Sequence, residues 1–358
     1  MTHSSSQWAM PLRHFIRYLP GQAYLWVAVL IFGTSGSITR KITEIGAHNF
    51  VGGSNPISLC NVLFVGNLCA LLIFAMIYRQ QWRWASLNQR THAEWRGLLA
   101  VAVLSGALAP GLIFQALALT PVTNVVLISR LEPPLTLALS IWLLHDRVSL
   151  WEVMGAIAAF IGVALTVFLQ PVKEPMMQVA AFQIGVGELL AIIGAIALSI
   201  STIVGKKRLS KVPLSVFSLV RTGVGTIIFF VTAIILYGPN HFMGAFSPFL
   251  WQWMLLYGGV IVVVGQTFWL TGLRASSIST ASIVGSFSPI FGILAAYLIL
   301  GEVPTSAQYM GGSVILLGLI LGQIGLRQRS AYRRQPATMP DVVPAEQAIE
   351  AGMGFKGL

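Results

Sequence analysis

Charged residues are scarce in this sequence. They make up 9% of its 358 residues, whereas soluble globular proteins carry about 25%. Hydrophobic residues reach 56%, which excludes a soluble enzyme and a disordered chain.

Cysteine is also rare. Cys60 and Cys69 are the only two cysteines, and they lie nine residues apart on one apolar run. Along a helix that separation is about 13.5 Å, which is too far for a disulfide, so a disulfide scaffold is excluded as well.

Motifs for catalysis and nucleotide hydrolysis are also missing. Gly205-Lys206-Lys207 is not a phosphate-binding loop, because Ile200 stands where the leading glycine belongs and Lys207 where serine or threonine belongs. The sequence contains no His-Glu-x-x-His, no paired cysteine set and no Gly-x-Ser-x-Gly. We therefore expect no enzymatic activity, no cofactor and no metal.

The sequence instead contains ten apolar runs, each long enough, or nearly so, to cross about 30 Å of hydrocarbon as a helix. The predicted fold class is an all-α integral membrane protein with ten transmembrane helices. The runs cover approximately residues 22–39, 57–78, 97–119, 122–144, 151–169, 186–205, 214–237, 250–273, 279–300 and 307–326.

The net charge of +11 comes from short basic clusters between these runs, which is the pattern of cytoplasmic loops rather than of a nucleic-acid-binding surface. With the N-terminus inside, 16 lysines and arginines fall on the cytoplasmic side and three on the other. We predict a multi-pass protein of the cell (inner) membrane with both termini in the cytoplasm, and no nucleic-acid partner.

The chain also contains an internal repeat. A shift of 156 residues places Pro133 on Pro289 and Asp146 on Glu302. Each half has five helices, and because five is odd the second half enters the membrane from the opposite side. Such an inverted 5+5 repeat is typical of secondary transporters, whose substrate site lies between the halves. The same shift aligns further residues, Gly155 with Gly311 and Gly162 with Gly318.

This repeat divides the chain. We predict a cytoplasmic N-terminal segment (1–21), a first repeat (22–169), an external linker (170–185), a second repeat (186–326) and a cytoplasmic tail (327–358). Because the tail has several prolines and little hydrophobic pattern, we expect it to be disordered.

The two repeats resemble EamA domains. The pattern of an EamA domain is a mid-helix proline followed by an apolar run that ends in Leu-Gly-Glu. The first repeat resembles it from Leu131-Glu132-Pro133-Pro134 through Leu144-His145-Asp146-Arg147. The second repeat matches it better, from Ser288-Pro289 through Leu300-Gly301-Glu302. The resemblance covers roughly residues 23–326 and implies the drug/metabolite transporter superfamily. Its ten-helix members have a central cavity lined by helices 1, 3, 4, 6, 8 and 9, and they move amino acids, nucleobase-like metabolites, sugar phosphates or drugs.

Prolines interrupt helices 4 and 9 at equivalent places. Pro133 and Pro134 remove two backbone donors near the centre of helix 4, and Pro289 interrupts helix 9 near Gly285. Paired interruptions are the best pointer to a transporter binding site, although membrane helices also contain proline kinks without such a role. We predict that the two breaks border the substrate site.

Two charges adjoin the first break, where members of the resembled family usually have apolar or small residues. Arg130 and Glu132 lie near the bilayer centre, where each charge costs about 2.5–3.5 kcal/mol. We predict that Arg130 binds a carboxylate or phosphate of the substrate and that Glu132 carries a coupling proton, because burial disfavours a charged carboxylate. The alternative is a structural ion pair, with Arg221 of helix 7 as one candidate partner of Glu132.

Other polar and aromatic residues are weaker candidates for substrate binding, because hydroxyl groups in membrane helices more often serve packing. They are Thr34 and Ser35 on helix 1, Gln115 on helix 3, Asn124 on helix 4, Ser201 on helix 6, Gln266 and Trp269 on helix 8, and Ser288 on helix 9.

The sequence thus predicts a secondary active transporter that exports a small metabolite, amino-acid-like or another small organic molecule, by alternating access. Its expected partners are that substrate, the lipid bilayer and protons. The alternatives are a channel, a non-transporting membrane scaffold and a membrane enzyme. An enzyme needs a cluster of catalytic groups at one depth, and all six histidines fall outside the central membrane zone.

Overall fold

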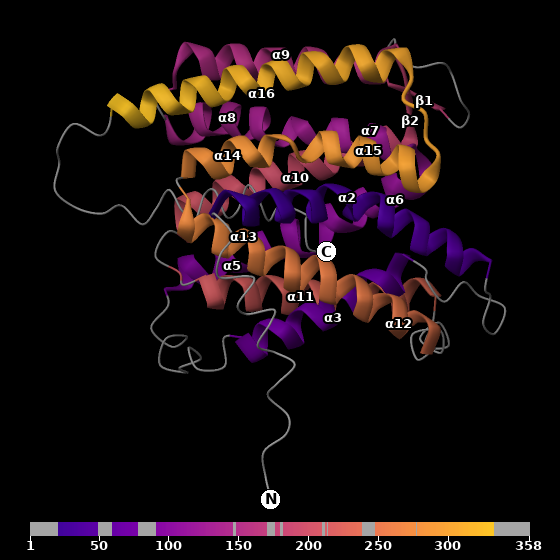
Figure 1. Cartoon of the computed structure of the whole chain (residues 1–358). Helices are drawn as coiled ribbons and strands as arrows, with labels where there is room; N and C mark the ends of the chain where they lie inside the picture. The colour runs from indigo at the N-terminus through magenta and orange to yellow at the C-terminus, as the bar shows by residue number, and fades with distance from the viewer. Residues whose placement is uncertain are drawn as a thin grey trace, which may run out of the picture.

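The chain folds into layers of roughly parallel and antiparallel helices (Figure 1). The computed structural model describes residues 21–48, 59–77, 91–145, 148–169, 176–179, 182–209, 212, 214–237, 248–276 and 278–332.

All regular elements that the structure describes in the first repeat are helices or helical turns. Its elements are α2 (Gly21–Ala47), α3 (Leu59–Ile77), α5 (His92–Val103), the π-helix η1 (Leu104–Leu108), α6 (Ala109–Leu119), α7 (Val122–Ile128), the 3-10 turn η2 (Ser129–Leu131), α8 (Glu132–Leu144) and α9 (Leu150–Phe168).

An antiparallel hairpin of two short strands leads into the second repeat. The elements are β1 (Met176–Val179), β2 (Phe182–Gly185), α10 (Val186–Arg208), α11 (Leu214–Tyr237), α12 (Pro248–Tyr257), the π-helix η4 (Gly258–Gly265), α13 (Gln266–Ala275), α14 (Ile278–Ser286), α15 (Ser288–Leu300) and α16 (Ser306–Tyr332).

Helices occupy all ten intervals predicted from the apolar runs. Within the described ranges, seven are long and apolar enough to cross a membrane, and Val62–Leu72 and Val216–Thr232 are shorter apolar stretches. Large apolar side chains point outward, such as Trp142, 73% exposed, and Ile235, 75% exposed. In lipid such exposure costs nothing, so the predicted all-α membrane fold is confirmed.

Several helices extend beyond the predicted runs. The helix predicted from residue 97 begins at His92, because Thr91 and Glu94 form a capping box in which the Thr91 N–H donates to the Glu94 carboxylate at 2.9 Å. α16 continues to Tyr332, so the expectation of disorder from residue 327 onward is wrong for residues 327–332. Glutamine and arginine there favour a helix; the rest of the tail lies outside the described residues.

We name the two ends of the bundle after the predicted topology. We call the end with the last residues of α2 and the hairpin the outer end, and the end with the last residues of α10 and α16 the inner end. In Figure 1 the outer end is on the right and the inner end on the left.

The two repeats interlock symmetrically. α2 packs against α13 and α15 of the second repeat, and its counterpart α10 packs against α6 and α8 of the first. The π-helices also correspond, because the 156-residue shift places η1 within η4. Each repeat therefore completes its core with helices of the other, as an inverted repeat requires.

The most extensive contact between two helices is that of α9 and α16, which lie side by side (Figure 1). A Cβ added to Gly155 would lie 2.5 Å from the carbonyl oxygen of Gly318, and one added to Gly162 would lie 2.6 Å from that of Gly311. Small residues allow such close backbone approach in membrane helices. The sequence repeat aligns Gly155 with Gly311, so the contacts are related by the pseudo-two-fold axis.

Candidate functional site

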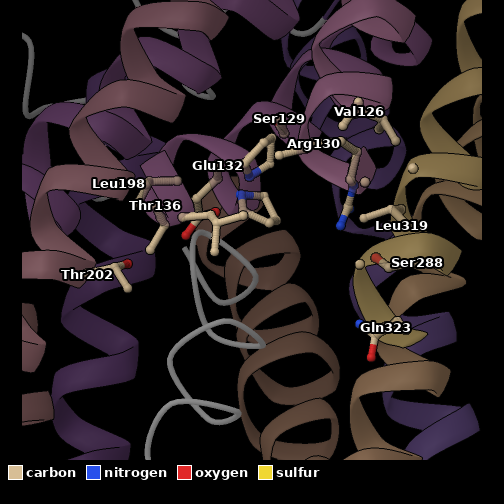
Figure 2. A pocket seen from close by; sticks show the side chains of 18 of the residues that line it. Val126, Ser129, Arg130, Glu132, Thr136, Leu198, Thr202, Ser288, Leu319 and Gln323 are labelled. Atoms are coloured by element: carbon tan, nitrogen blue, oxygen red, sulfur yellow. The ribbon is translucent and has the colours of Figure 1, made fainter. Parts of the chain in front are cut away.

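A central pocket of about 420 Å³ lies between the two repeats. Its walls come from α2, from the broken helix α7–η2–α8, and from α9, α10, α15 and α16. Figure 2 shows it from close by. Its polar and charged lining residues are Ser35, Ser129, Arg130, Glu132, Thr136, Ser140, Glu152, Thr202, Lys206, Ser288 and Gln323.

The pocket extends toward the inner end. Glu152 lies in the first turn of α9 and Lys206 in the last turn of α10, and both belong to its lining. Leu326 of α16, which lies at the same end, also lines it. In the predicted topology these are the cytoplasmic ends of their helices.

Pro133 and Pro134 end one helix and begin another. α7 stops at Ile128, the residues Ser129–Leu131 form a 3-10 turn, and α8 starts with these prolines in its first turn. A helix tolerates proline there, because the first N–H groups have no partner inside the helix. The other break follows the same plan: α14 ends at Ser286, and α15 begins with Pro289 in its first turn.

The break brings Arg130 and Glu132 to one pocket. In a regular α-helix two residues that are two positions apart point about 160° from each other, whereas a 3-10 turn reduces that angle to about 120°. Figure 2 shows the Arg130 guanidinium group pointing toward Ser288 and Gln323. Its Nε atom is buried and has no hydrogen-bond partner among the described residues.

Six of the predicted site residues line the central pocket. They are Ser35, Arg130, Glu132, Pro133, Pro134 and Ser288. The Ser35 hydroxyl also donates to the backbone oxygen of Phe32 at 2.7 Å. Residues of both repeats therefore meet at one site.

The other candidates lie outside this lining. Thr34 donates to the Ile31 oxygen at 3.0 Å, and Trp269 is buried against Phe32 with their ring centroids 6.4 Å apart. Pro289 borders a separate cavity of about 110 Å³. The remaining residues are Gln115, half-buried on α6; Ser201, buried on α10 beside the lining residue Thr202; and Gln266, the first residue of α13, whose side chain lies outside the described part.

Asn124 lies in a hydrogen-bonded network near the outer end. Its side chain is fully buried and donates to Glu188 at 2.8 Å, while Gln308 donates to its oxygen. Asn124 does not line the central pocket, because it lies eight positions before Glu132 and this separates the two by about 12 Å along a helix. Arg221, the suggested partner of Glu132, packs against Gly106 of η1.

Sequence reasoning did not select seven of the polar lining residues, which are Ser129, Thr136, Ser140, Glu152, Thr202, Lys206 and Gln323. Lys206 was counted only as a cytoplasmic loop charge. Glu152 stands three residues after Ser149, where a helix-capping acid belongs. The signal that could have revealed it is an acid at the start of an otherwise apolar helix. The structure buries this side chain, which is 3% exposed.

The described residues contain no group of three or more His, Cys, Asp or Glu side chains placed to hold a metal ion. The lining offers a guanidinium, an ammonium, carboxylates, hydroxyls and an apolar wall. Pockets of this composition and size bind small molecules.

Comparison with known proteins agrees with this architecture. The family model for the EamA-like transporter family matches residues 19–168 and 185–322. An uncharacterized transporter of Synechocystis sp. is 44% identical over 344 residues, which cover 96% of this chain and 97% of that protein. A crystal structure that is 19% identical superposes with a TM-score of 0.52 over 86% of this chain and 98% of its own, and this likeness concerns the fold alone. The chain therefore belongs to the EamA-like transporter family, whose members are multi-pass membrane transporters.

Proposed function

We propose that this protein is a secondary active transporter that exports a small metabolite with an anionic group from the cytoplasm by alternating access. The observation that carries the proposal is Arg130. Its guanidinium group projects from a helix break into the pocket between the repeats, with a buried Nε that has no hydrogen-bond partner among the described residues. An unsatisfied cationic donor in low dielectric binds a carboxylate or phosphate strongly.

The remaining lining supports an amino-acid-like substrate. Arg130 and Lys206 supply positive charge to the pocket, and Glu132 and Glu152 supply negative charge. A molecule with a carboxylate and an ammonium group is complementary to both signs. The pocket volume of about 420 Å³ lies in the lower part of the range of about 300–1,000 Å³ typical for small-ligand sites.

The proposed direction of transport is supported by the end that the pocket reaches. The pocket lining extends to the inner end, which the distribution of Lys and Arg predicts to be cytoplasmic. A substrate loaded from that side is released on the other after the bundle rearranges. The sequence contains no nucleotide-hydrolysis motif, so we propose that gradients drive the cycle, with Glu132 as the group that binds and releases a proton.

The test is a metabolite export screen in cells with and without the protein, followed by uptake and exchange assays in proteoliposomes. Arg130→Gln should lower transport of the identified substrate about tenfold or more, because a charge-assisted hydrogen bond is lost. Arg130→Lys should retain part of the activity. Lys207→Gln removes an exposed positive charge at the end of α10 and should leave transport unchanged.

The amount of folded protein distinguishes a binding role from a packing role. If folding and transport fall in parallel in Arg130→Gln, Arg130 is a packing residue. Continuous ion conduction through the purified protein, without saturation by any substrate, would instead identify a channel.

A further inference from the structure

Polar side chains from both repeats close the bundle at its outer end. They come from α2, from the start of α7, from α10, from the turn after α15 and from α16. We call this set the outer network; it consists of Arg40, Thr120, Asn124, Glu188, Glu302 and Gln308.

Arg40 and Glu302 form the peripheral part of the outer network. An Arg40 guanidinium nitrogen (Nη1) lies 3.4 Å from a Glu302 carboxylate oxygen and donates to the Thr120 backbone oxygen at 2.7 Å. The same carboxylate accepts from the backbone N–H groups of Val122 at 3.1 Å and Thr123 at 3.3 Å. Glu302 of the second repeat thus caps the first turn of α7, a helix of the first repeat, where unsatisfied N–H groups favour a negative charge.

A buried layer lies beneath that ion pair. Glu188 of α10 accepts from the Thr120 hydroxyl and from the Asn124 amide, the latter at 2.8 Å. Gln308 of α16 donates to the Asn124 oxygen. All four side chains are buried, at 8% exposure or less. Hydrogen bonds in such a dry layer are costly to leave unmade, so they hold the outer ends of α7, α10 and α16 together.

The equivalent position at the inner end belongs to the pocket lining. A shift of 166 residues relates α2 to α10 and places Arg40 on Lys206, and Lys206 lines the central pocket. The pocket lining therefore reaches the inner end, whereas at the outer end the outer network joins the two repeats.

We propose that the outer network is the gate of the transporter at its outer end, and that the Arg40–Glu302 ion pair must break in each cycle for the pocket to open there. This inference rests on the alternating access proposed above. It gives roles to Glu188 and Glu302, two acids outside the central pocket, and to Asn124.

A reporter cysteine tests the gate without any substrate. Thr202→Cys, which lies in the pocket lining, is introduced into a variant lacking Cys60 and Cys69. A membrane-impermeant maleimide is applied to one side of the membrane at a time. The outer side is defined as the side from which a separate His48→Cys variant reacts. In the otherwise unchanged protein the reporter should react from the inner side and only slowly from the outer side.

Glu302→Gln and Arg40→Gln should each increase the rate of labelling from the outer side by about tenfold, because a charge-assisted contact that favours the closed state is lost. Glu44→Gln is the matched control. It removes the other acid that lies 3.4 Å from Arg40, which is on the same helix and half-buried, and should leave outer labelling unchanged. Glu188→Gln, which affects the buried layer, provides a third variant if either of the first two is poorly folded.

Unchanged outer labelling in folded Glu302→Gln and Arg40→Gln protein would overturn the gate. If the unchanged protein shows no export of any substrate yet the variants open to the outer side, the gate stands and the proposed transport function fails. The two proposals are therefore tested separately.

Discussion

His145 and Gly301 end equivalent helices of the two repeats in the same left-handed conformation. Their φ angles are 55° and 69°, and they are the positive-φ residues of the described chain. In the second repeat a glycine adopts this conformation without steric cost, whereas in the first repeat histidine has a Cβ atom that disfavours it. His145 is exposed and Gly301 has no atom within 4 Å of an added Cβ, so neighbouring groups do not decide the difference.

His145→Gly should therefore stabilise the protein by about 1 kcal/mol, because it removes left-handed strain at the end of α8. The expected rise in the thermal unfolding midpoint in detergent is about 1–3 °C. The reciprocal variant Gly301→His should lower the midpoint by a similar amount. Equal midpoints for all three proteins would contradict this explanation.

Gly318→Ala should destabilise the contact between α9 and α16. The new Cβ would lie 2.6 Å from the Gly155 oxygen and 2.8 Å from the Ala159 nitrogen, so the helices must move apart at a cost of about 1–3 kcal/mol. Gly322→Ala is the control four residues further along, where no atom lies within 4 Å of an added Cβ. Thermal unfolding in detergent should show a loss for the first variant only; a loss in both would point to a general intolerance of α16.

Single cysteines test the predicted orientation. In a protein without Cys60 and Cys69, Gln328→Cys at the inner end should react with an impermeant maleimide only from the cytoplasm. His48→Cys, at the outer end of α2, should react only from outside. Both positions are exposed. The reverse sidedness would refute the charge argument, and labelling of both from one side would refute the inverted topology.

Glu132→Gln tests the proposed coupling. Glutamine keeps the shape of the side chain but cannot bind or release a proton, so accumulation of substrate driven by a pH gradient should be lost. Exchange of substrate across a liposome membrane without a gradient should remain measurable. Glu44→Gln, a change outside the central pocket, should leave both activities intact. If the Glu132→Gln variant still concentrates substrate under a pH gradient, Glu132 does not carry the proton.

Much of the fold could be predicted from the sequence because lipid imposes simple rules. Apolar runs of membrane-spanning length must be helices, and an odd number of them per repeat requires inversion. The helix break was equally predictable, since Pro133 and Pro134 lack the N–H groups that continue a helix. That it takes the form of a 3-10 turn, and thereby turns Arg130 and Glu132 toward one pocket, depends on packing that a single helix does not specify.

The position of the pocket along the bundle was less predictable. Helical periodicity gives the direction in which a side chain points but not the depth at which two repeats leave a space. Asn124 therefore appeared to be a pocket residue, although it lies in the outer network, and Lys206 appeared to be only a loop charge, although it lines the pocket. Both errors have the same cause. The sequence does not show toward which end of the bundle the pocket extends.

The glycine contacts of α9 and α16 have the symmetry of an interface between identical subunits. Gly155 meets Gly318 and Gly162 meets Gly311, so each glycine and its repeat partner take the same place on the two helices, as in an isologous interface. Two half-length chains inserted in opposite orientations would make the same pair of contacts. The interface between these two helices therefore has the geometry of a symmetric dimer contained within one chain.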